Sequence, residues 1–190
     1  MVSAVPTPSP AQEVRHLTVK ETAAQIRRAV RAAFPGVAFS VRMATGSAYG
    51  WVHVSWADGP RHLQVREVVA PFESSRFDGM DDTYHSVPQD GPVRYSCRGV
   101  STSRADGPQG LTHAVEVMRA AGADVELVTT PRGRLEVHGV VPGPIAAVLG
   151  VANVWGGTPA QPADVEASFA AAQIIGRTDF TTPPAGAEEG

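Results

Sequence analysis

The spacing of hydrophobic residues changes from helical to strand-like early in the chain. Apolar side chains recur every three or four positions from Val19 onward, which predicts a helix over residues 18–33. Thr18 and Glu21 stand three residues apart at its start, which is the spacing of a capping box. Apolar and polar residues then alternate, and this alternation predicts a strand over residues 37–43.

The same alternation returns twice after a glycine-containing loop. It predicts strands over residues 51–56 and 93–102, with a second amphipathic helix over residues 61–72 between them. Asp58 and Gly59 form the turn before this helix, and we expect Asp58 to cap it. The predicted fold class is α+β, with a small antiparallel sheet and helices packed on one face in the order α-β-β-α-β.

The second half of the chain repeats this kind of pattern more loosely. We expect a domain over residues 17–104, followed over residues 105–176 by a second small module of the order α-β-β-α. A further, last helix is expected after these four elements, capped by Asp164. Residues 1–16 are rich in Pro, Ser and Ala, residues 177–190 are rich in Thr, Pro, Ala and Gly, and neither segment shows periodicity. Both end segments are therefore expected to be disordered.

Composition restricts the setting of the protein. No apolar stretch in the sequence is long enough to span a membrane, and the opening residues do not follow the pattern of a secretory signal. We therefore expect a cytoplasmic protein without membrane contact. The single cysteine, Cys97, stands in a strand-like pattern, which favours a small buried side chain.

Charge is distributed unevenly along the chain. Residues 1–104 carry 12 Lys and Arg against 9 Asp and Glu, whereas residues 105–190 carry 4 against 10. A balance of +3 in the first part is small for a dedicated nucleic-acid-binding domain. It is nevertheless compatible with a weakly basic face that meets an acidic partner or a phosphate backbone.

Five residues are candidates for a nucleic-acid interface. Arg27, Arg28 and Arg31 lie off the apolar stripe of the first helix, and Arg42 and Trp51 belong to the predicted outward face of the sheet. Arginines contact phosphates, and an exposed aromatic ring stacks on a base. For the three helix arginines, a solvated helix face is the alternative interpretation.

A compact polar segment follows the second helix. Asp78, Asp81, Asp82 and His85 lie within eight positions, which raises the question of a metal or acid–base site. The segment lacks the alternating acidic positions and the final glutamate of a calcium loop. We therefore predict no metal and no cofactor here.

A turn explains the same segment more simply. Gly79 would supply a left-handed backbone position, while Asp78 or Asp81 would accept hydrogen bonds from nearby amides. Phe77 and Met80, together with Phe72, would anchor the turn to the core. The structural turn residues are accordingly Asp58, Gly59, Asp78, Gly79 and Asp81.

Two motifs resemble a known family. They are the W-x-D-G-P turn from Trp56 to Pro60 and the F-x-x-x-x-F-D-G-M segment from Phe72 to Met80. With the predicted elements around them, residues 17–104 resemble the large polyvalent protein associated domain 29. This resemblance implies a setting in phages or bacterial mobile elements. It implies no catalytic residues, because none is assigned in the family.

Three functions remain open from the sequence. We favour a non-enzymatic accessory or interaction module of a bacterial mobile element or phage, which would hold a protein partner by a sheet edge and exposed helix faces. The second is weak, sequence-independent binding of nucleic acid by the candidate arginines and Trp51. The third is an enzyme of unknown reaction that uses the aspartates around Asp81 and His85.

Overall fold

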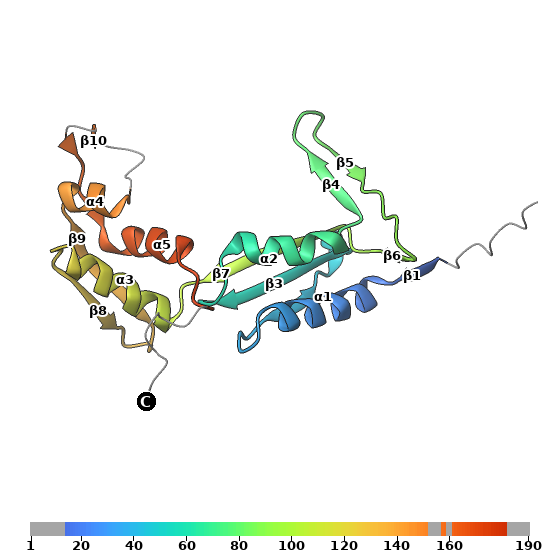
Figure 1. Ribbon diagram of the computed structural model, residues 1–190, viewed down its shortest axis with the longest axis horizontal. Helices are drawn as coiled ribbons and strands as arrows, with labels where there is room; N and C mark the ends of the chain where they lie inside the picture. The colour runs from blue at the N-terminus through green and yellow to red at the C-terminus, as the bar shows by residue number, and fades with distance from the viewer. Residues whose placement is uncertain (1–13, 152–156, 159–160, 182–190) are drawn as a thin grey trace, which may run out of the picture.

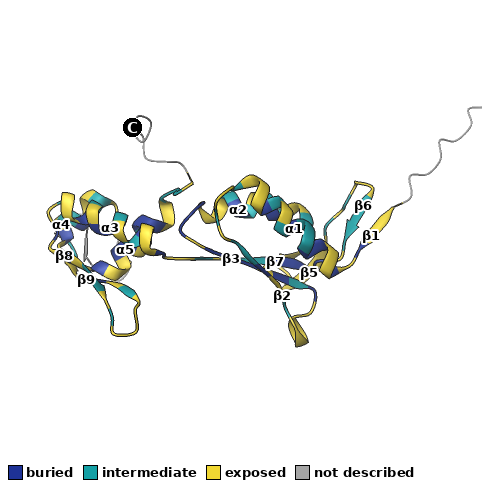
Figure 2. Ribbon diagram, turned by 90° about the horizontal axis from the view of Figure 1, so that it is seen from below, coloured by how far each residue is buried: buried dark blue, intermediate teal, exposed yellow. Residues whose placement is uncertain are grey.

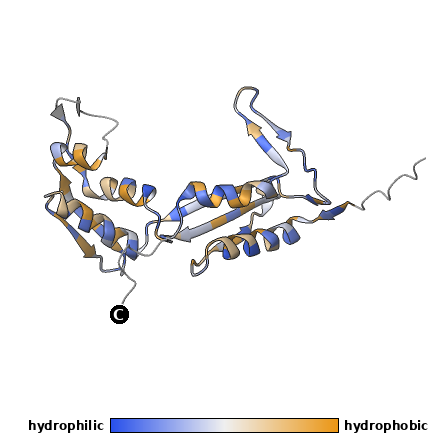
Figure 3. Ribbon diagram, in the orientation of Figure 1, coloured by the Kyte–Doolittle hydropathy of each residue, from blue (hydrophilic) through white to orange (hydrophobic). Residues whose placement is uncertain are grey.

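The protein is described by a computed structural model that places residues 14–151, 157–158 and 161–181. Figure 1 shows two lobes that lie end to end. They are joined where strand β7 (Gly99–Ala105) leads into helix α3 (Pro108–Ala120). In both lobes hydrophobic and hydrophilic residues alternate along the helices, as Figure 3 shows.

The amino-terminal lobe is built on a three-stranded sheet. Its strand order is β2 (Ser40–Met43), β3 (Trp51–Ala57), β7. Helices α1 (Val19–Ala33) and α2 (His62–Val69) cover the same face of this sheet (Figure 2). The α+β class is confirmed.

Strand alternation explains which face the helices cover. The inward positions of the strands meet the apolar stripes of the helices in one core. The buried residues of this core include Val41, Val52, Val54, Trp56 and Val100 from the sheet and Ile26, Val30, Val65 and Val69 from the helices. Removal of this apolar surface from water stabilises the lobe.

The prediction of a wholly antiparallel sheet is wrong. Strands β2 and β3 are antiparallel, but β3 and β7 are parallel, with Val52 opposite Val100. Parallel neighbours need a crossover connection, and the chain that includes α2 provides it. Periodicity gives a strand its faces but not its direction, so the sequence pattern did not distinguish the two arrangements.

Local sequence signals set the start of α1 and the end of α2. The Thr18 amide donates to Glu21 Oε2 at 2.9 Å, and the Glu21 amide donates to Thr18 Oγ1 at 3.3 Å. The predicted capping box is confirmed. The second predicted helix is shorter than expected, because α2 gives way at Ala70–Phe72 to a 3-10 turn that contains Pro71.

Two smaller strand pairs complete this lobe. Strand β1 (Arg15–Leu17) pairs in parallel with β6 (Val93–Tyr95), so the predicted strand over residues 93–102 divides into β6 and β7. Strands β4 (Ser75–Asp78) and β5 (Thr83–Ser86) form an antiparallel hairpin. Figure 1 shows this hairpin projecting from one end of the sheet.

The second lobe has its own antiparallel sheet. Its strand order is β12 (Val165–Glu166), β9 (Leu135–Val141), β8 (Val125–Thr129). Helix α5 (Ala167–Arg177) packs on β9 and on α3. The core of this lobe is separate from the first and includes Ala114, Val115, Met118, Val137, Val141, Ala170, Ile174 and Ile175.

Short elements connect the strands and helices of this lobe. Helix α4 (Gly143–Leu149) follows β9, and β10 (Gly157–Thr158) pairs with β11 (Gln161–Pro162). Asp164 does not cap α5 as expected, since its Oδ1 accepts a hydrogen bond from the Gly143 amide at 2.8 Å. The Asp164 side chain therefore accepts a hydrogen bond from the first residue of α4.

The expected disordered ends overlap with described elements. Strand β1 begins at Arg15, inside the expected segment 1–16, and α5 ends at Arg177. The remainder of both expected segments, residues 1–13 and 182–190, lies outside the described residues. No helix in the described part of the chain combines the length and apolarity needed to cross a bilayer.

Candidate functional site

The sheet of the first lobe has one face that α1 and α2 do not cover. Strand pairing sets Arg42, His53 and Ser101 in one row across this face. The next row consists of three serines, and Trp51 lies two positions from His53 on the same side. We call the following residues the open face: Ser40, Arg42, Trp51, His53, Ser55, Ser101 and Ser103.

The open face is rich in hydrogen-bond donors and has no acidic group. Neither Asp nor Glu occurs in β2, β3 or β7. Arg42 and His53 are exposed, and the His53 Nδ1 is hydrogen-bonded to the Ser101 hydroxyl. A histidine beside a serine is the beginning of a nucleophile–base pair, but these strands offer no carboxylate to orient the other ring nitrogen. This composition favours binding over catalysis.

A row of aromatic rings extends the open face onto the hairpin. Trp51 is partly exposed, and its ring meets that of Tyr84 edge-on at a centroid distance of 6.0 Å. Tyr84 in turn meets Phe77 at 5.1 Å. The Arg98 guanidinium carbon lies 5.6 Å from the centre of the Tyr84 ring, within cation–π distance. Trp51, Tyr84 and Phe77 thus form a row of aromatic rings, and Arg98 lies beside its middle member.

Side chains form hydrogen bonds with backbone groups of both edge strands, β2 and β7. Arg27 Nη2 donates to the Val41 carbonyl at 2.9 Å, on β2. On β7, Arg66 Nη1 donates to the Val100 carbonyl at 2.8 Å, and the Val100 amide donates to Glu73 Oε1 at 2.8 Å. A partner strand would have to displace these groups before it could extend the sheet.

The structure separates the five predicted nucleic-acid residues into two groups. Arg42 and Trp51 lie together on the open face. Arg28 and Arg31 are exposed on α1, which packs on the opposite face, and Arg27 is engaged with the edge of β2. A single ligand on the open face would therefore contact only part of the predicted set.

The acidic segment forms the turn of the β4–β5 hairpin. Asp78 Oδ1 accepts a hydrogen bond from the Met80 amide at 2.9 Å, and Asp81 Oδ1 accepts one from the Thr83 amide at 3.1 Å. Each aspartate thus bonds the amide two residues ahead, which is the pattern of an Asx turn. These bonds are of the kind that the turn interpretation requires.

Two details of the turn differ from expectation. The left-handed residue is Asp82, with φ of 55°, and Gly79 is not among the residues of positive φ. Phe77 is 48% exposed and Met80 is 95% exposed, so they do not anchor the turn to the core. The hairpin projects from the sheet, and its apolar side chains have no core to enter.

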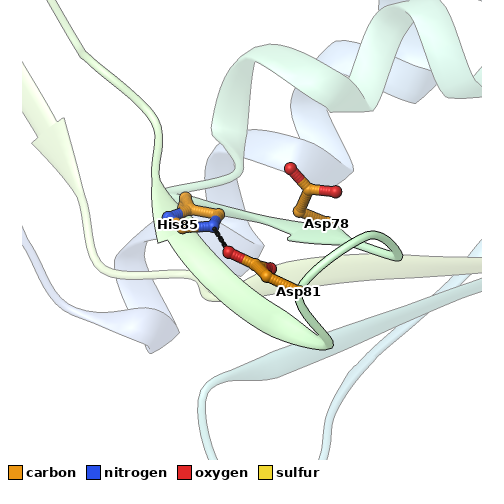
Figure 4. Close-up of side chains that lie close together, drawn as sticks. All are labelled: Asp78, Asp81 and His85. Carbon is orange, nitrogen blue, oxygen red and sulfur yellow. Dashed lines mark hydrogen bonds and ion pairs between the residues drawn. The ribbon is translucent and has the colours of Figure 1, made fainter.

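Three groups of this turn converge at its exposed end. His85 Nε2 lies 2.7 Å from Asp81 Oδ2, as Figure 4 shows. Together with Asp78 they offer one ligand atom each within 4.8 Å of one another, and all three residues are exposed. The hydrogen bonds of the aspartates to backbone amides already give these residues a structural role. That no metal binds here stays a prediction.

The junction between the lobes contains a buried carboxylate, Asp58, whose partner differs from the predicted one. Asp58 does not cap α2; it caps α3. Its Oδ1 accepts hydrogen bonds from the amides of Gly107 and Gly110, both at 2.9 Å, and its Oδ2 accepts one from the Gln109 amide at 3.1 Å. Asp58 is 8% exposed and has a φ of 50°. The helix that it caps begins about fifty residues further along the chain.

Arg104 bonds the same junction from the end of β7. Its guanidinium donates four hydrogen bonds of 2.9 to 3.0 Å and lies 5.4 Å from the centre of the Phe180 ring. The acceptors are the carbonyls of Asp58, Gly59, Ile175 and Thr178. Burial lowers the pKa of Arg104 below its ordinary value, and nearby aspartates counteract this shift. No short motif marks this role, because an arginine that ends a strand is common.

A family model matches most of the first lobe. The model of the large polyvalent protein associated domain 29 matches residues 17–107. Residues 17–107 are therefore similar to this family. The match runs from β1 through β7 and ends at Gly107, which donates to Asp58. The searches of curated proteins and of solved structures found no match.

The domain 29 match confirms the resemblance seen in the W-x-D-G-P and F-x-x-x-x-F-D-G-M motifs. The domain has no assigned function, which is consistent with an accessory module. In this chain, the first motif contributes to the junction and the second motif continues into the projecting hairpin.

Proposed function

We propose that this chain is an accessory binding module of a bacterial mobile element or phage and that its open face binds single-stranded nucleic acid. The setting is the one that domain 29 implies. The observation that carries the choice of ligand is the composition of the open face, where arginine, histidine, serine and tryptophan occur without a carboxylate.

Each group on the open face suits part of a nucleotide. Arg42, His53 and the serine hydroxyls donate hydrogen bonds to phosphate oxygens. Trp51 and Tyr84 offer ring surface for bases, and stacking of this kind tolerates any sequence. A single strand exposes both its bases and its phosphates, whereas a duplex hides its bases. Single strands are therefore the preferred form in this proposal.

Affinity is expected to be weak. Few arginines belong to this surface, so few counterions are released on binding and the decrease of affinity with salt is shallow. The aspartates at the hairpin turn repel phosphates, which confines the ligand to the sheet side of Tyr84.

A protein partner is the second candidate, and the hairpin favours it. Phe77 and Met80 are exposed apolar side chains on an element that projects from the sheet. A partner that covers them would gain apolar burial. Strand addition to the sheet is less favoured, because Arg27 on one edge and the Arg66–Glu73 pair on the other occupy backbone groups.

Fluorescence anisotropy of a labelled oligothymidylate tests the first proposal. Trp51→Ala should weaken binding by about 1–3 kcal/mol, the usual contribution of one stacked base, and Trp51→Phe should retain most of the affinity. Arg42→Ala should weaken binding and reduce its salt dependence. Leu63→Ala, on the exposed side of α2, is the matched control.

Two results would contradict this assignment. One is an absence of binding at low salt. The other is a larger loss in the double variant Arg28→Ala and Arg31→Ala than in Trp51→Ala, which would place the interface on α1.

A further inference from the structure

At the junction, Asp58 and Arg104 each bind the end of a helix whose dipole has the opposite sign to the charge of the side chain. Asp58 lies at the amino end of α3, where unpaired amides and the helix dipole favour a negative charge. Arg104 donates to Ile175 and Thr178 at the carboxyl end of α5, where carbonyls and the dipole favour a positive charge. The two charged residues of the first lobe thus bind opposite ends of two helices in the second.

The Arg104 side chain also binds the backbone of the turn that carries Asp58. Arg104 Nε donates to the Asp58 carbonyl at 2.9 Å, and Arg104 Nη2 donates to the Gly59 carbonyl at 3.0 Å. Asp58 holds a left-handed backbone conformation that is unfavourable for most residues. These bonds from Arg104 hold the turn in this conformation, so the carboxylate is already directed toward α3.

The first turn of α3 has space for this carboxylate only because it contains glycine. A Cβ on Gly110 would lie 2.5 Å from Asp58 Oδ1, and a Cβ on Gly107 would also overlap the carboxylate. Neither position has a positive φ, so the backbone conformation does not demand glycine. Glycine is needed here because the Asp58 carboxylate lies where a Cβ would be. The sequence Gly-Pro-Gln-Gly of residues 107–110 therefore complements Asp58.

The carboxyl-terminal segment adds contacts beside the two charges. The Phe180 amide donates to the Gly59 carbonyl at 2.9 Å, and Gln64 Nε2 donates to Asp179 Oδ2 at 2.7 Å. The Phe180 ring also meets His113 of α3 at 5.5 Å. The segment after α5 thus contacts both lobes.

We propose that Asp58 and Arg104 form a clasp through which domain 29 holds the module that follows it in a fixed orientation. The partner that fits the clasp is a pair of helix ends: an amino end with glycine at its first and fourth residues, counted from Gly107, and a carboxyl end followed by an aromatic residue. In this chain α3 and α5 supply them. The W-x-D-G-P turn is then a docking element. The open face of the first lobe consequently keeps a constant position relative to the second lobe.

This proposal is independent of nucleic-acid binding. The clasp lies at the junction, whereas the open face is defined by other residues. A failure of either proposal leaves the other standing.

Distance measurement between spin labels in the full chain tests the clasp. Labels at Lys20→Cys on α1 and Arg132→Cys in the β8–β9 turn occupy exposed positions in different lobes, while the natural Cys97 is buried. Double electron–electron resonance should give one narrow distance in the otherwise unchanged chain. Asp58→Ala should broaden the distribution and remove the single narrow distance.

Two further variants test the geometry of the clasp. Gly110→Ala places a methyl group against the carboxylate and should broaden the distance as Asp58→Ala does. Arg104→Lys keeps the charge but cannot reach four carbonyls, so it should give an intermediate broadening. The matched controls are Asp124→Ala, an exposed aspartate of the second lobe, and Gly176→Ala, where a Cβ meets no neighbour within 4 Å.

Circular dichroism of each variant shows whether both lobes remain folded. A narrow and unchanged distance in folded Asp58→Ala would overturn the proposal. If Asp58→Ala does not fold, Gly110→Ala decides by the same criterion. Equal broadening in the two control variants would also overturn the proposal, because it would show that any substitution loosens the junction.

Discussion

The indole ring of Trp51 lies over Gly99 on the neighbouring strand. A Cβ built on Gly99 would lie 2.7 Å from the ring, closer than real Cβ atoms approach. Parallel pairing of β3 and β7 places these two residues opposite each other. The missing side chain of Gly99 thus lets the ring lie across β7 on the open face.

Gly99→Ala is expected to displace the Trp51 ring. Such overpacking commonly costs about 1–3 kcal/mol of unfolding free energy. Urea denaturation measures this cost, and a change in the tryptophan fluorescence of the folded protein reports the movement of the ring. Gly79→Ala is the control, because a Cβ there has no neighbour within 4 Å. Unchanged fluorescence in Gly99→Ala would contradict the contact.

Glu73→Ala is expected to destabilise the first lobe. The Val100 amide would lose its acceptor, and Arg66 Nη1, now 3.0 Å from Glu73 Oε1, would lose its ion pair. An unpaired buried donor costs about 1–3 kcal/mol, while the partly exposed ion pair adds little. Glu73→Gln retains an acceptor and should cost less. Glu67→Ala, exposed on α2, should have almost no effect in the same denaturation experiment.

Stability should fall at high pH because of Cys97. Burial raises the pKa of this thiol from an ordinary value of 9.0 to about 11, since the thiolate is poorly solvated in the core. The folded state therefore prefers the neutral thiol, and this contribution is present below pH 9.0 and lost as the pH rises through about 11. Cys97→Ala should show a smaller loss across this range in denaturation measured as a function of pH.

The same burial should protect Cys97 from thiol reagents at neutral pH. Labelling should be slow in the folded protein and rapid after denaturation. Rapid labelling of the folded protein would show that the core around this residue opens.

The hairpin turn should not depend on a metal. We expect calorimetry with magnesium, manganese or calcium to show no micromolar binding. Asp81→Asn keeps an acceptor for the Thr83 amide and should leave stability almost unchanged, whereas Asp81→Ala should lose about 0.5–1.5 kcal/mol. Tight binding that disappears in Asp81→Asn would instead assign a cation site to Asp78, Asp81 and His85.

The sequence by itself determined the features that depend on neighbouring residues. The capping box of Thr18 and Glu21 and the faces of β2 and β3 follow from spacings of two to four positions. The α+β class and the resemblance to domain 29 follow from the order of such elements and from the W-x-D-G-P turn. Short-range sterics and hydrogen bonds fix these features, so a single sequence reveals them.

Only the tertiary structure decided which distant residues meet. A strand pattern is the same in either direction, so the parallel pairing of β7 with β3 was not visible in it. Asp58 has the chemistry of a cap next to either helix, and the folded chain directs it to Gly107 and Gly110 instead of α2. Arg27 likewise bonds Val41 across the edge of the sheet. These outcomes depend on the packing of elements far apart in the chain, which local spacing does not encode.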